Sequence, residues 1–463
     1  MNADIRKVHF MGICGTAMGA VAAMMKDDGY DVSGSDENVY PPMSTFLQEK
    51  DIVLQAGYSP ENLALKPDLV VVGNAISRGN LELEEVLDER FYYLSLPETL
   101  KTFFLRKTHN LVVTGTHGKT TTTSLLAWIF EHAELKPSYL IGGIPLNFNQ
   151  GCRRQAGHYW ILEGDEYDTA FFDKRSKFLH YLPELVIINN IEFDHADIYA
   201  SLDAIKNSFR QLVNIIPRDG MLLINADDAN AREVAANAQS QILEVGFSEN
   251  AAVRVTQHRM DASGSHFHFL GKDFFLPLFG KHNIANAAMA IAAAHFYQIP
   301  LEKVAEALKN FKGIKRRMEI RAEVKGITIV DDFGHHPTAL RETMTALRAK
   351  FSGVKIWALF EPRSNTTRRN VFQKELPAAL ALADGVFVSQ VARLEQLPEN
   401  QRLNPEKVIA DIKTAGKPAY YEPTADAIVQ KLVPQLKKGD VVAVFSNGGF
   451  DNIHQKLIKA LTG

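Results

Sequence analysis

Hydrophobic and polar positions along the chain follow two alternating patterns. Short runs rich in Val, Ile, Leu and Phe are followed by longer segments in which apolar residues recur with helical spacing. This alternation predicts parallel sheets built from strand–helix–strand units, and therefore an α/β protein. Strands are expected at residues 7–11, 69–73, 111–114, 185–189, 327–330, 356–360 and 441–446. Ligands bind at the carboxyl ends of such strands, which here carry glycine or polar residues.

The length of 463 residues predicts more than one domain. Two polar segments, "LRKTHN" at 105–110 and "NFKGIKRRME" at 310–319, are expected to be connectors. We therefore predict domains at 1–107, 108–313 and 314–463.

Composition and charge then exclude several functions. With 51 basic and 54 acidic residues, the chain has no overall field to attract nucleic acid or an anionic membrane. Cys14 and Cys152 are too few for a disulfide framework or a structural zinc site, and we expect both to pack as small apolar residues in a reducing compartment. The N-terminus lacks a signal-peptide pattern, and the longest apolar helical stretch is too short to cross a bilayer. These observations predict a cytoplasmic protein.

A glycine-rich loop follows the first strand in "VHFMGICGTAMGAVAAMM". Gly12, Gly15 and Gly19 let the backbone approach a pyrophosphate, and the following helix offers unpaired N–H groups at its N-terminus. The spacing differs from the dinucleotide fingerprint G-x-G-x-x-G, which argues against a nicotinamide or flavin cofactor. A nucleotide site and a structural tight turn both remain open.

Polar residues after the next two strands are expected to face the same crevice. Ser33, Ser35 and Asp36 end the second strand and suit the hydroxyls of a ribose or sugar. Asn74 closes the third strand, where the role of a turn-forming asparagine fits equally well.

The segment "LVVTGTHGKTTTTSLL" predicts a phosphate-binding loop. It keeps the G-K-T core of the mononucleotide pattern G-x-x-x-x-G-K-[ST], although Val113 replaces the first glycine. We expect backbone N–H groups of 115–121 to hold phosphates, Lys119 to neutralise the β and γ oxygens, and the Thr120 hydroxyl to meet Mg²⁺. A plain strand–turn–helix connection is the alternative.

Two acidic segments follow strands of the same predicted domain, "YWILEGDEYDTAFFD" and "LVIINNIEFDHADIY". Both can reach the edge of the sheet that carries the phosphate loop, so together they predict a metal and substrate site, although each carboxylate alone fits a solvated loop. The residues concerned are Glu163, Asp165, Glu166, Asp168, Asn190, Asp194, His195 and Asp197.

Polar residues near the second connector suggest an adenine site. In "LFGKHNIANAAMAIAAA", His282, Asn283 and Asn286 could clamp and read a purine, while Asn283 as a helix N-cap is an equal alternative. The third segment opens with Arg316 and Arg317 and continues "ITIVDDFGHHPTAL", in which a helix is expected from Pro337. The paired His335 and His336 have no nearby cysteine or other ligand at the spacing of a zinc site, which argues against zinc. Asp331 and Asp332 close a strand in the same stretch.

With "GTHGKTTT", "EGDEYD", "NNIEFDHADIY", "GKHNIANA" and "DDFGHHPTA" in this order, the chain resembles the Mur ligase family, ATP-dependent amide-forming enzymes of peptidoglycan synthesis. The resemblance implies three domains: a Rossmann-like N-terminal domain for a UDP-sugar, a central P-loop ATPase domain, and a Rossmann-like C-terminal domain that closes over ATP and the incoming amine. "GICGTAMG" and "DDFGHHPT" are similar to the branch that joins UDP-N-acetylmuramate to L-alanine. "NVYPPMST", "FDKRSKF", "FEPRSNT" and "SNGGFDNIHQKL" are similar to the recycling branch, which uses the tripeptide L-alanyl-γ-D-glutamyl-meso-diaminopimelate, and we favour that branch.

The resemblance also implies roles for individual residues. The implied catalytic residues are Lys119, Glu163, His195 and Arg317, and the implied magnesium ligands are Thr120, Glu163 and His195. ATP is expected to contact Gly115, Thr116, His117, Gly118, Lys119, Thr120, Thr121, His282, Asn283, Asn286, Arg317 and Asp332. The UDP-sugar is expected at Gly12, Ile13, Cys14, Gly15, Thr16, Ser35, Asp36 and Asn74, and the peptide at Arg363, Ser364 and Asn365.

One position departs from the family pattern. Several members carry a carbamylated lysine fifteen residues after the metal-binding histidine, where this chain has Arg210. Arginine cannot form that carbamate, so we expect either the charge of Arg210 or other ligands to replace it. The base that deprotonates the amine is open among His335, His336 and a nearby carboxylate. A phosphate-loop kinase and a non-catalytic UDP-sugar sensor are the alternatives from other functional classes.

Overall fold

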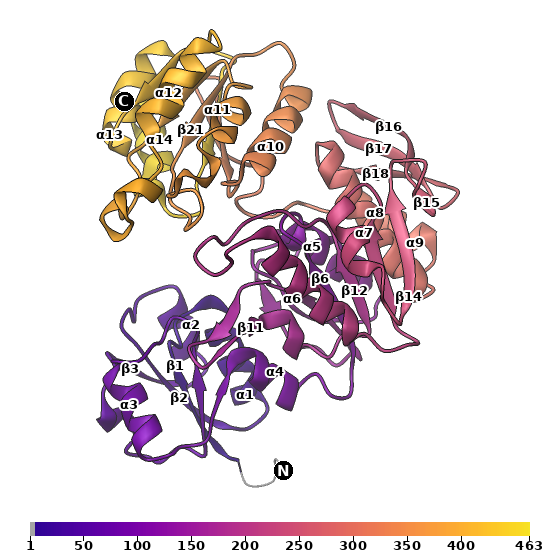
Figure 1. The fold of residues 1–463 in the computed structure, drawn as a ribbon, viewed down its shortest axis with the longest axis vertical. Helices are drawn as coiled ribbons and strands as arrows, with labels where there is room; N and C mark the ends of the chain where they lie inside the picture. The colour runs from indigo at the N-terminus through magenta and orange to yellow at the C-terminus, as the bar shows by residue number, and fades with distance from the viewer. Residues whose placement is uncertain (1–4) are drawn as a thin grey trace.

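The computed structural model describes residues 5–463, which form three separate α/β units, each around its own mainly parallel sheet (Figure 1). The predicted fold class is therefore confirmed. The N-terminal sheet has five parallel strands in the order β3 (Val53–Ala56), β2 (Asp31–Asp36), β1 (Lys7–Met11), β4 (Leu69–Val72) and β5 (Tyr93–Ser95). Its apolar residues pack against α1 (Thr16–Asp27) and α4 (Leu96–Phe103) on one face and α3 (Leu81–Asp88) on the other.

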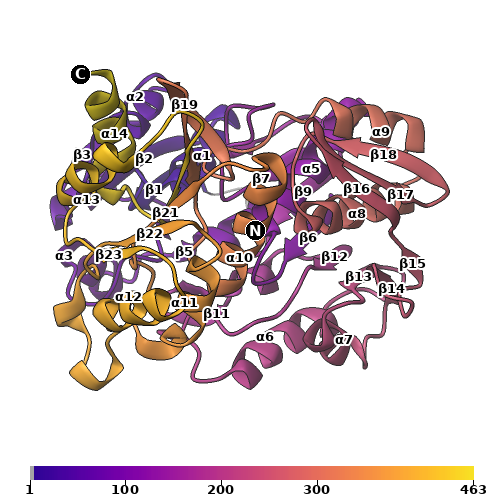
Figure 2. The same cartoon turned by 90° about the horizontal axis from the view of Figure 1, so that it is seen from above.

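The central sheet has eight strands. Their order is β15 (Val253–Arg254), β14 (Gln241–Gly246), β13 (Met221–Asn225), β12 (Leu185–Ile188), β6 (His109–Thr114), β9 (Tyr159–Glu163), β7 (Ser138–Leu140) and β8 (Cys152–Arg153). One face packs against α5 (Lys119–His132), α8 (Lys281–Phe296) and α9 (Leu301–Lys309), and the other against α6 (Leu202–Asn214) and α7 (Ala229–Ala235). Figure 2 shows these two helical layers on opposite sides of the sheet. A small antiparallel sheet of β16 (Thr256–Asp261), β17 (Gly264–Phe269) and β18 (Lys272–Leu276) packs beside α8 and α9.

The C-terminal sheet has six strands. Their order is β19 (Glu319–Val324), β20 (Ile327–Asp332), β24 (Val441–Phe445), β21 (Ile356–Phe360), β22 (Gly385–Val388) and β23 (Ala419–Tyr421), and β19 is antiparallel to β20. One face packs against α10 (Pro337–Lys350), α11 (Glu375–Leu380) and α12 (Pro405–Thr414), the other against α13 (Ala425–Leu432) and α14 (Ile453–Thr462). The helix expected from Pro337 is thus α10.

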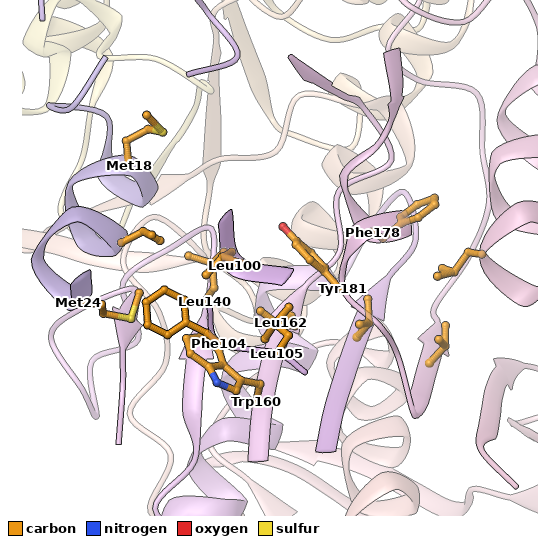
Figure 3. Close-up of a cluster of buried hydrophobic side chains, with 14 of the residues drawn as sticks. Met18, Met24, Leu100, Phe104, Leu105, Leu140, Trp160, Leu162, Phe178 and Tyr181 are labelled. Atoms are coloured by element: carbon orange, nitrogen blue, oxygen red, sulfur yellow. The ribbon is translucent and has the colours of Figure 1, made fainter. Parts of the chain in front are cut away.

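The N-terminal and central units share one hydrophobic cluster. Figure 3 shows Leu100 and Phe104 from the N-terminal unit beside Trp160, Phe178 and Tyr181 of the central unit, and the rings of Phe104 and Trp160 are 6.1 Å apart. The core clusters of the C-terminal unit contain no apolar residue of the other two units within the described chain. An apolar core holds packed units in one arrangement, whereas a polar interface permits relative motion. The interface of the C-terminal unit therefore permits motion relative to the other two units more readily than a shared core would.

All seven predicted strands occur, within a few residues of their expected bounds. The domain breaks at 107 and 314 stay a prediction. Among residues 5–463, no helix is both long and apolar enough to cross a bilayer.

Candidate active site

The predicted phosphate loop lies between β6 and α5. Gly115 has φ +128° and Gly118 has φ +81°, a backbone region that side chains with a Cβ disfavour. A Cβ on Gly118 would also lie 2.3 Å from Asn286 Oδ1, so this position requires glycine. Two further hydrogen bonds hold the loop, because Asn190 accepts the N–H groups of Thr116 through its carbonyl and of His117 through its side chain. The N–H groups at the start of α5 are left to face a ligand.

The loop opens into a cavity of about 900 Å³ between the central and C-terminal units. Most of the residues predicted to bind ATP or metal line this cavity: Thr116, His117, Gly118, Lys119, Thr120, Thr121, Glu163, His195, His282, Asn283, Asn286, Arg317 and Asp332. The structure therefore brings together motifs that are spread over more than 200 residues of sequence.

Lys119 lies at the centre of a buried charge network. Its ammonium donates to Glu166 Oε2 at 2.8 Å and to the Gly115 carbonyl at 2.7 Å, and His195 Nε2 lies 3.3 Å from Glu166 Oε1. Burial alone would raise the pKa of Glu166, but the charges of Lys119 and His195 hold it at about 2. The same carboxylate raises the pKa of Lys119 and of His195 against the effect of burial. Lys119 is therefore fully protonated beside the loop.

Glu163 and Thr120 form the group best suited to magnesium. The Thr120 hydroxyl donates to Glu163 Oε1 at 2.9 Å, and the other carboxylate oxygen accepts the N–H of Gly142 at 2.7 Å. Burial and then Asp165 raise the pKa of Glu163, against the smaller effects of the Gly142 N–H and the Lys119 charge. A Cβ on Gly142 would lie 2.9 Å from Glu163, so the glycine leaves room there. The hard oxygens of Thr120 and Glu163 fit Mg²⁺, and the predicted ligand His195 contacts Glu166 here.

The polar residues of α8 pack beneath the phosphate loop. Asn286 accepts the Thr122 hydroxyl at 3.2 Å and donates to Asn283 at 3.3 Å, and Asn283 donates to the Phe279 carbonyl. Asn283 is not the N-cap of α8, which is Gly280. Asn286 therefore packs directly against Gly118 and Thr122, and Asn283 holds Asn286 in place; adenine recognition by them stays a prediction.

The C-terminal unit reaches the loop through Arg317. Its guanidinium lies 3.4 Å from the Thr120 hydroxyl and packs over the Phe333 ring. Asp332 is buried, which raises its pKa, and it accepts the N–H groups of Met318 and Gly334. Asp332 thus fixes the backbone directly after Arg317 and the turn at Gly334 that precedes His335. Arg316 turns away instead and donates to the carbonyls of the 446–448 loop.

Carboxylates of the second acidic segment form a clasp between the central and C-terminal units. Asp194 accepts the Thr366 hydroxyl at 2.6 Å, Asp197 accepts the Asn365 amide at 2.7 Å, and Glu192 accepts the Thr338 hydroxyl at 2.7 Å. We expected this cluster to contribute to a metal and substrate site. Asp194 also lines the cavity, so its role in a metal and substrate site stays a prediction, whereas Asp197 does not line the cavity and bonds to the closing unit. Sequence reasoning missed Glu192, Thr338 and Thr366, although all three stand within or next to the motifs it used.

The paired histidines, His335 and His336, both lie at this interface but have different neighbours. His336 caps α10, because its Nδ1 accepts the Thr338 N–H, and its Nε2 lies 3.3 Å from the Phe193 carbonyl. Burial, and then the neighbouring His117, lower the pKa of His336 to about 4. His335 lies beside Asp194, with 3.7 Å between Nε2 and Oδ2, and both histidines line the cavity.

The residues predicted to bind a UDP-sugar gather at the carboxyl edge of the N-terminal sheet. The N–H groups of Gly12 and Ile13 donate to the Ser35 carbonyl, and that of Cys14 donates to Asp36 at 2.9 Å. Gly15 is the N-cap of α1, so the N-terminus of this helix, from Thr16, opens at the loop.

The hydroxyls of Ser35 and Ser33 contact other protein side chains. Ser35 is fully buried, and its hydroxyl donates to the buried Glu82, so it supports the loop and its hydroxyl does not face a sugar. Ser33 is likewise turned to His9, whereas Asn74 is exposed at the strand end.

The predicted peptide residues lie at the ends of β21 and β24. Arg363 is about half exposed, lies 3.4 Å from Glu361 Oε1, and packs against the backbone of Gly448. Ser364 contacts Thr367 at 2.7 Å, and Asn365 belongs to the clasp. The half-exposed Arg363 guanidinium can therefore donate to a ligand that approaches from solvent.

Arg210 does not replace the carbamylated lysine. From α6 it donates to Asn207 of the same helix and to Glu233 of α7, at 2.6 Å each, and it does not line the cavity, so the expectation that its charge acts in the site is wrong. Asp168 is likewise outside the cavity and pairs with Lys174.

Three family models match consecutive parts of the chain. The model described as Mur ligase family, catalytic domain, matches residues 7–108; Mur ligase middle domain matches 113–294; and Mur ligase, glutamate ligase domain, matches 316–448.

Individual relatives match over the full length. A protein of Haemophilus influenzae named UDP-N-acetylmuramate–L-alanyl-gamma-D-glutamyl-meso-2,6-diaminoheptandioate ligase is 43% identical over 462 residues, covering 99% of each chain. A protein of a Sulfurihydrogenibium species named UDP-N-acetylmuramate–L-alanine ligase is 30% identical and covers 99% of this chain and 98% of its own. The crystal structure of a murein peptide ligase from Psychrobacter arcticus has 36% identity and a TM-score of 0.71, covering 98% of both chains.

Proposed function

The chain belongs to the Mur ligase family, whose members are ATP-dependent amide-bond ligases, and from this premise we propose that it joins UDP-N-acetylmuramate to L-alanyl-γ-D-glutamyl-meso-diaminopimelate. The observation that carries the proposal is the 43% identity, over the whole chain, to a ligase named for this tripeptide. The relative named for L-alanine is 30% identical over a similar length. The tripeptide is a fragment of peptidoglycan, so the reaction recycles cell-wall material.

The chemistry requires an activated carboxylate, because a carboxylate and an ammonium do not condense in water. The lactyl carboxylate attacks the γ-phosphorus of ATP, the β–γ P–O bond breaks, and ADP takes the electron pair. The α-amine of the tripeptide then attacks the acyl carbon, and the tetrahedral intermediate expels phosphate. Catalysis of both steps depends mainly on positioning and on neutralising negative charge.

The positions of individual side chains support specific roles. Lys119 and Arg317 approach the loop from the central and C-terminal units, where both can neutralise the transferred phosphoryl group. The side chains of Thr120, Glu163 and His195 fit Mg²⁺, which when bound would neutralise phosphate oxygens. The clasp at Asp194 and its partners keeps the C-terminal unit over the cavity.

His335 is the residue we propose as the base for the incoming amine. It lines the cavity, and its Nε2 faces Asp194, which can stabilise the imidazolium that forms. His336 is the weaker base of the two, because burial and then His117 lower its pKa to about 4, and its Nδ1 caps α10. We further propose that the enzyme works in the cytoplasm, where ATP and UDP-sugars are available.

A coupled ADP-release assay with UDP-N-acetylmuramate tests the proposal. The tripeptide should support turnover at least tenfold better in kcat/KM than free L-alanine at equal concentration. Preference for alanine would assign the chain to the alanine-adding branch. A kinase would yield a stable phosphorylated product without an amide, and a sensor would release no ADP with any acceptor.

A further inference from the structure

A β-hairpin of the central unit bridges the UDP-sugar loop and the ATP cavity. It consists of β10 (Asp168–Ala170) and β11 (Asp173–Ser176). Its tip residues Phe171 and Phe172 pack against the N-terminal cluster that contains Met11 and Ile76, and the rings of Phe172 and Tyr93 are 5.0 Å apart. Met11 directly precedes the glycine loop. Figure 1 shows β11 at the junction between the N-terminal and central units.

Lys177 follows this hairpin and points to the cavity wall. Its ammonium lies 4.1 Å from the centre of the Tyr167 ring and 3.6 Å from Asp165 Oδ2. Tyr167 and Asp165 both line the cavity, and the Tyr167 ring is 5.3 Å from the ring of His195. The Lys177 side chain is 17% exposed, similar to the 12% of Lys119. Lys177 does not itself line the cavity, but its ammonium contacts two residues that do, Asp165 and Tyr167.

The two lysines differ in how their donors are used. Lys119 donates to Glu166 and to carbonyls of the phosphate loop. The Lys177 ammonium makes no hydrogen bond of 3.5 Å or less to any group in the part of the chain that the structure describes, and 3.6 Å to Asp165 is too long for one. Its three N–H donors are thus available to an anion that binds between the N-terminal and central units.

We propose that Lys177 binds the lactyl carboxylate of UDP-N-acetylmuramate and positions it for attack on the γ-phosphorus, an inference that rests on the proposed function. That carboxylate must lie between the UDP-sugar loop and the phosphate loop, which is the span of the hairpin. The carboxylate and the triphosphate repel one another, and a cation beside the carboxylate reduces this repulsion. Because the N-terminal and central units share one core, the position of Lys177 does not depend on closure of the C-terminal unit.

The test compares two ligands that differ in the lactyl group. UDP-N-acetylglucosamine has the nucleotide and sugar of UDP-N-acetylmuramate but lacks the carboxylate. Calorimetric titration of the full chain should show that Lys177→Met weakens binding of UDP-N-acetylmuramate about 10- to 100-fold, the value of a hydrogen bond to a charged group. Binding of UDP-N-acetylglucosamine and of ATP should stay within about twofold. Lys177→Arg should restore part of the lost affinity, because it keeps the charge.

Lys174→Met is the matched control, because Lys174 lies on the same hairpin, 69% exposed and away from the cavity. It should leave all three affinities unchanged. Equal weakening of both UDP-sugars by Lys177→Met, or unchanged affinity for UDP-N-acetylmuramate, would overturn the role of Lys177. Failure of the wild-type protein to bind UDP-N-acetylmuramate would instead overturn the proposed function, and this inference with it.

Discussion

Replacing Lys119 by methionine separates the two contributions of this side chain, to folding and to phosphoryl transfer. Methionine keeps most of the apolar stem and removes the ammonium, which donates to Glu166 at 2.8 Å and to the Gly115 carbonyl at 2.7 Å. The side chain of Glu166 is only 3% exposed, so Lys119→Met leaves a buried carboxylate with His195 as its remaining cationic neighbour. Breaking a buried ion pair from one side costs about 3–5 kcal/mol in the free energy of unfolding.

The loss of activity should exceed what destabilisation explains. An ammonium directed at the transferred phosphoryl group acts like an oxyanion-stabilising donor, whose removal lowers kcat by about 10²–10³. Adding Glu166→Gln removes the stranded charge, so the double variant Lys119→Met/Glu166→Gln should recover most of the lost stability but not the lost ADP release. Urea unfolding and the coupled ADP assay measure the two effects separately.

The pH dependence of stability gives a further check on the same pair. The pKa of Glu166 is about 2 in the folded protein and about 4.3 in an unfolded chain. A lowered folded-state pKa stabilises the protein above the unfolded pKa, and this contribution is lost as the pH falls towards 2. The stability difference between wild type and Lys119→Met should therefore shrink between about pH 5 and pH 2. Near-normal ADP release by Lys119→Met, or recovery of activity in the double variant, would refute the assignment of Lys119 to phosphate.

Three further substitutions test the loop, the peptide site and the clasp. Gly118→Ala places a Cβ 2.3 Å from Asn286 Oδ1 at a residue with φ +81°. It should lower the free energy of unfolding in urea by about 2–4 kcal/mol and weaken ATP binding at least tenfold. Wild-type values for both would contradict the loop geometry. Arg363→Ala should raise KM for the tripeptide about 10- to 100-fold without changing KM for UDP-N-acetylmuramate, and the reverse pattern would place Arg363 elsewhere. Thr366→Val removes the donor to Asp194, so small-angle scattering with ATP should show a more open molecule and KM for ATP should rise; an unchanged profile would exclude the clasp.

The fold was predictable because hydrophobic spacing reports local structure. Buried parallel strands such as β4, β21 and β24 are continuous apolar runs, and their carboxyl ends carry the expected polar residues. The motifs around Lys119, Glu163 and His195 could likewise be placed in one cavity, because each follows a strand or loop of the same sheet.

The functions of single polar side chains in the site were less predictable. A carboxylate after a strand looks the same in sequence whether it faces a metal or a neighbouring unit, and Asp194 and Asp197 accept hydrogen bonds from Thr366 and Asn365, respectively. Arg210 stands at the sequence position where several family members carry the carbamylated lysine, but α6 directs its side chain towards Glu233. Such differences depend on the orientation of one unit against another, which no local pattern reports.

The most direct test of the account follows the oxygen atoms of the lactyl carboxylate. UDP-N-acetylmuramate with both carboxylate oxygens labelled with ¹⁸O is incubated with ATP, the tripeptide and the enzyme, and the released phosphate and the amide product are analysed by mass spectrometry. Attack of the carboxylate on the γ-phosphorus predicts one ¹⁸O atom in each phosphate molecule and one in each new amide. Unlabelled phosphate would contradict the acyl-phosphate mechanism, and with it the role proposed for the loop at Lys119.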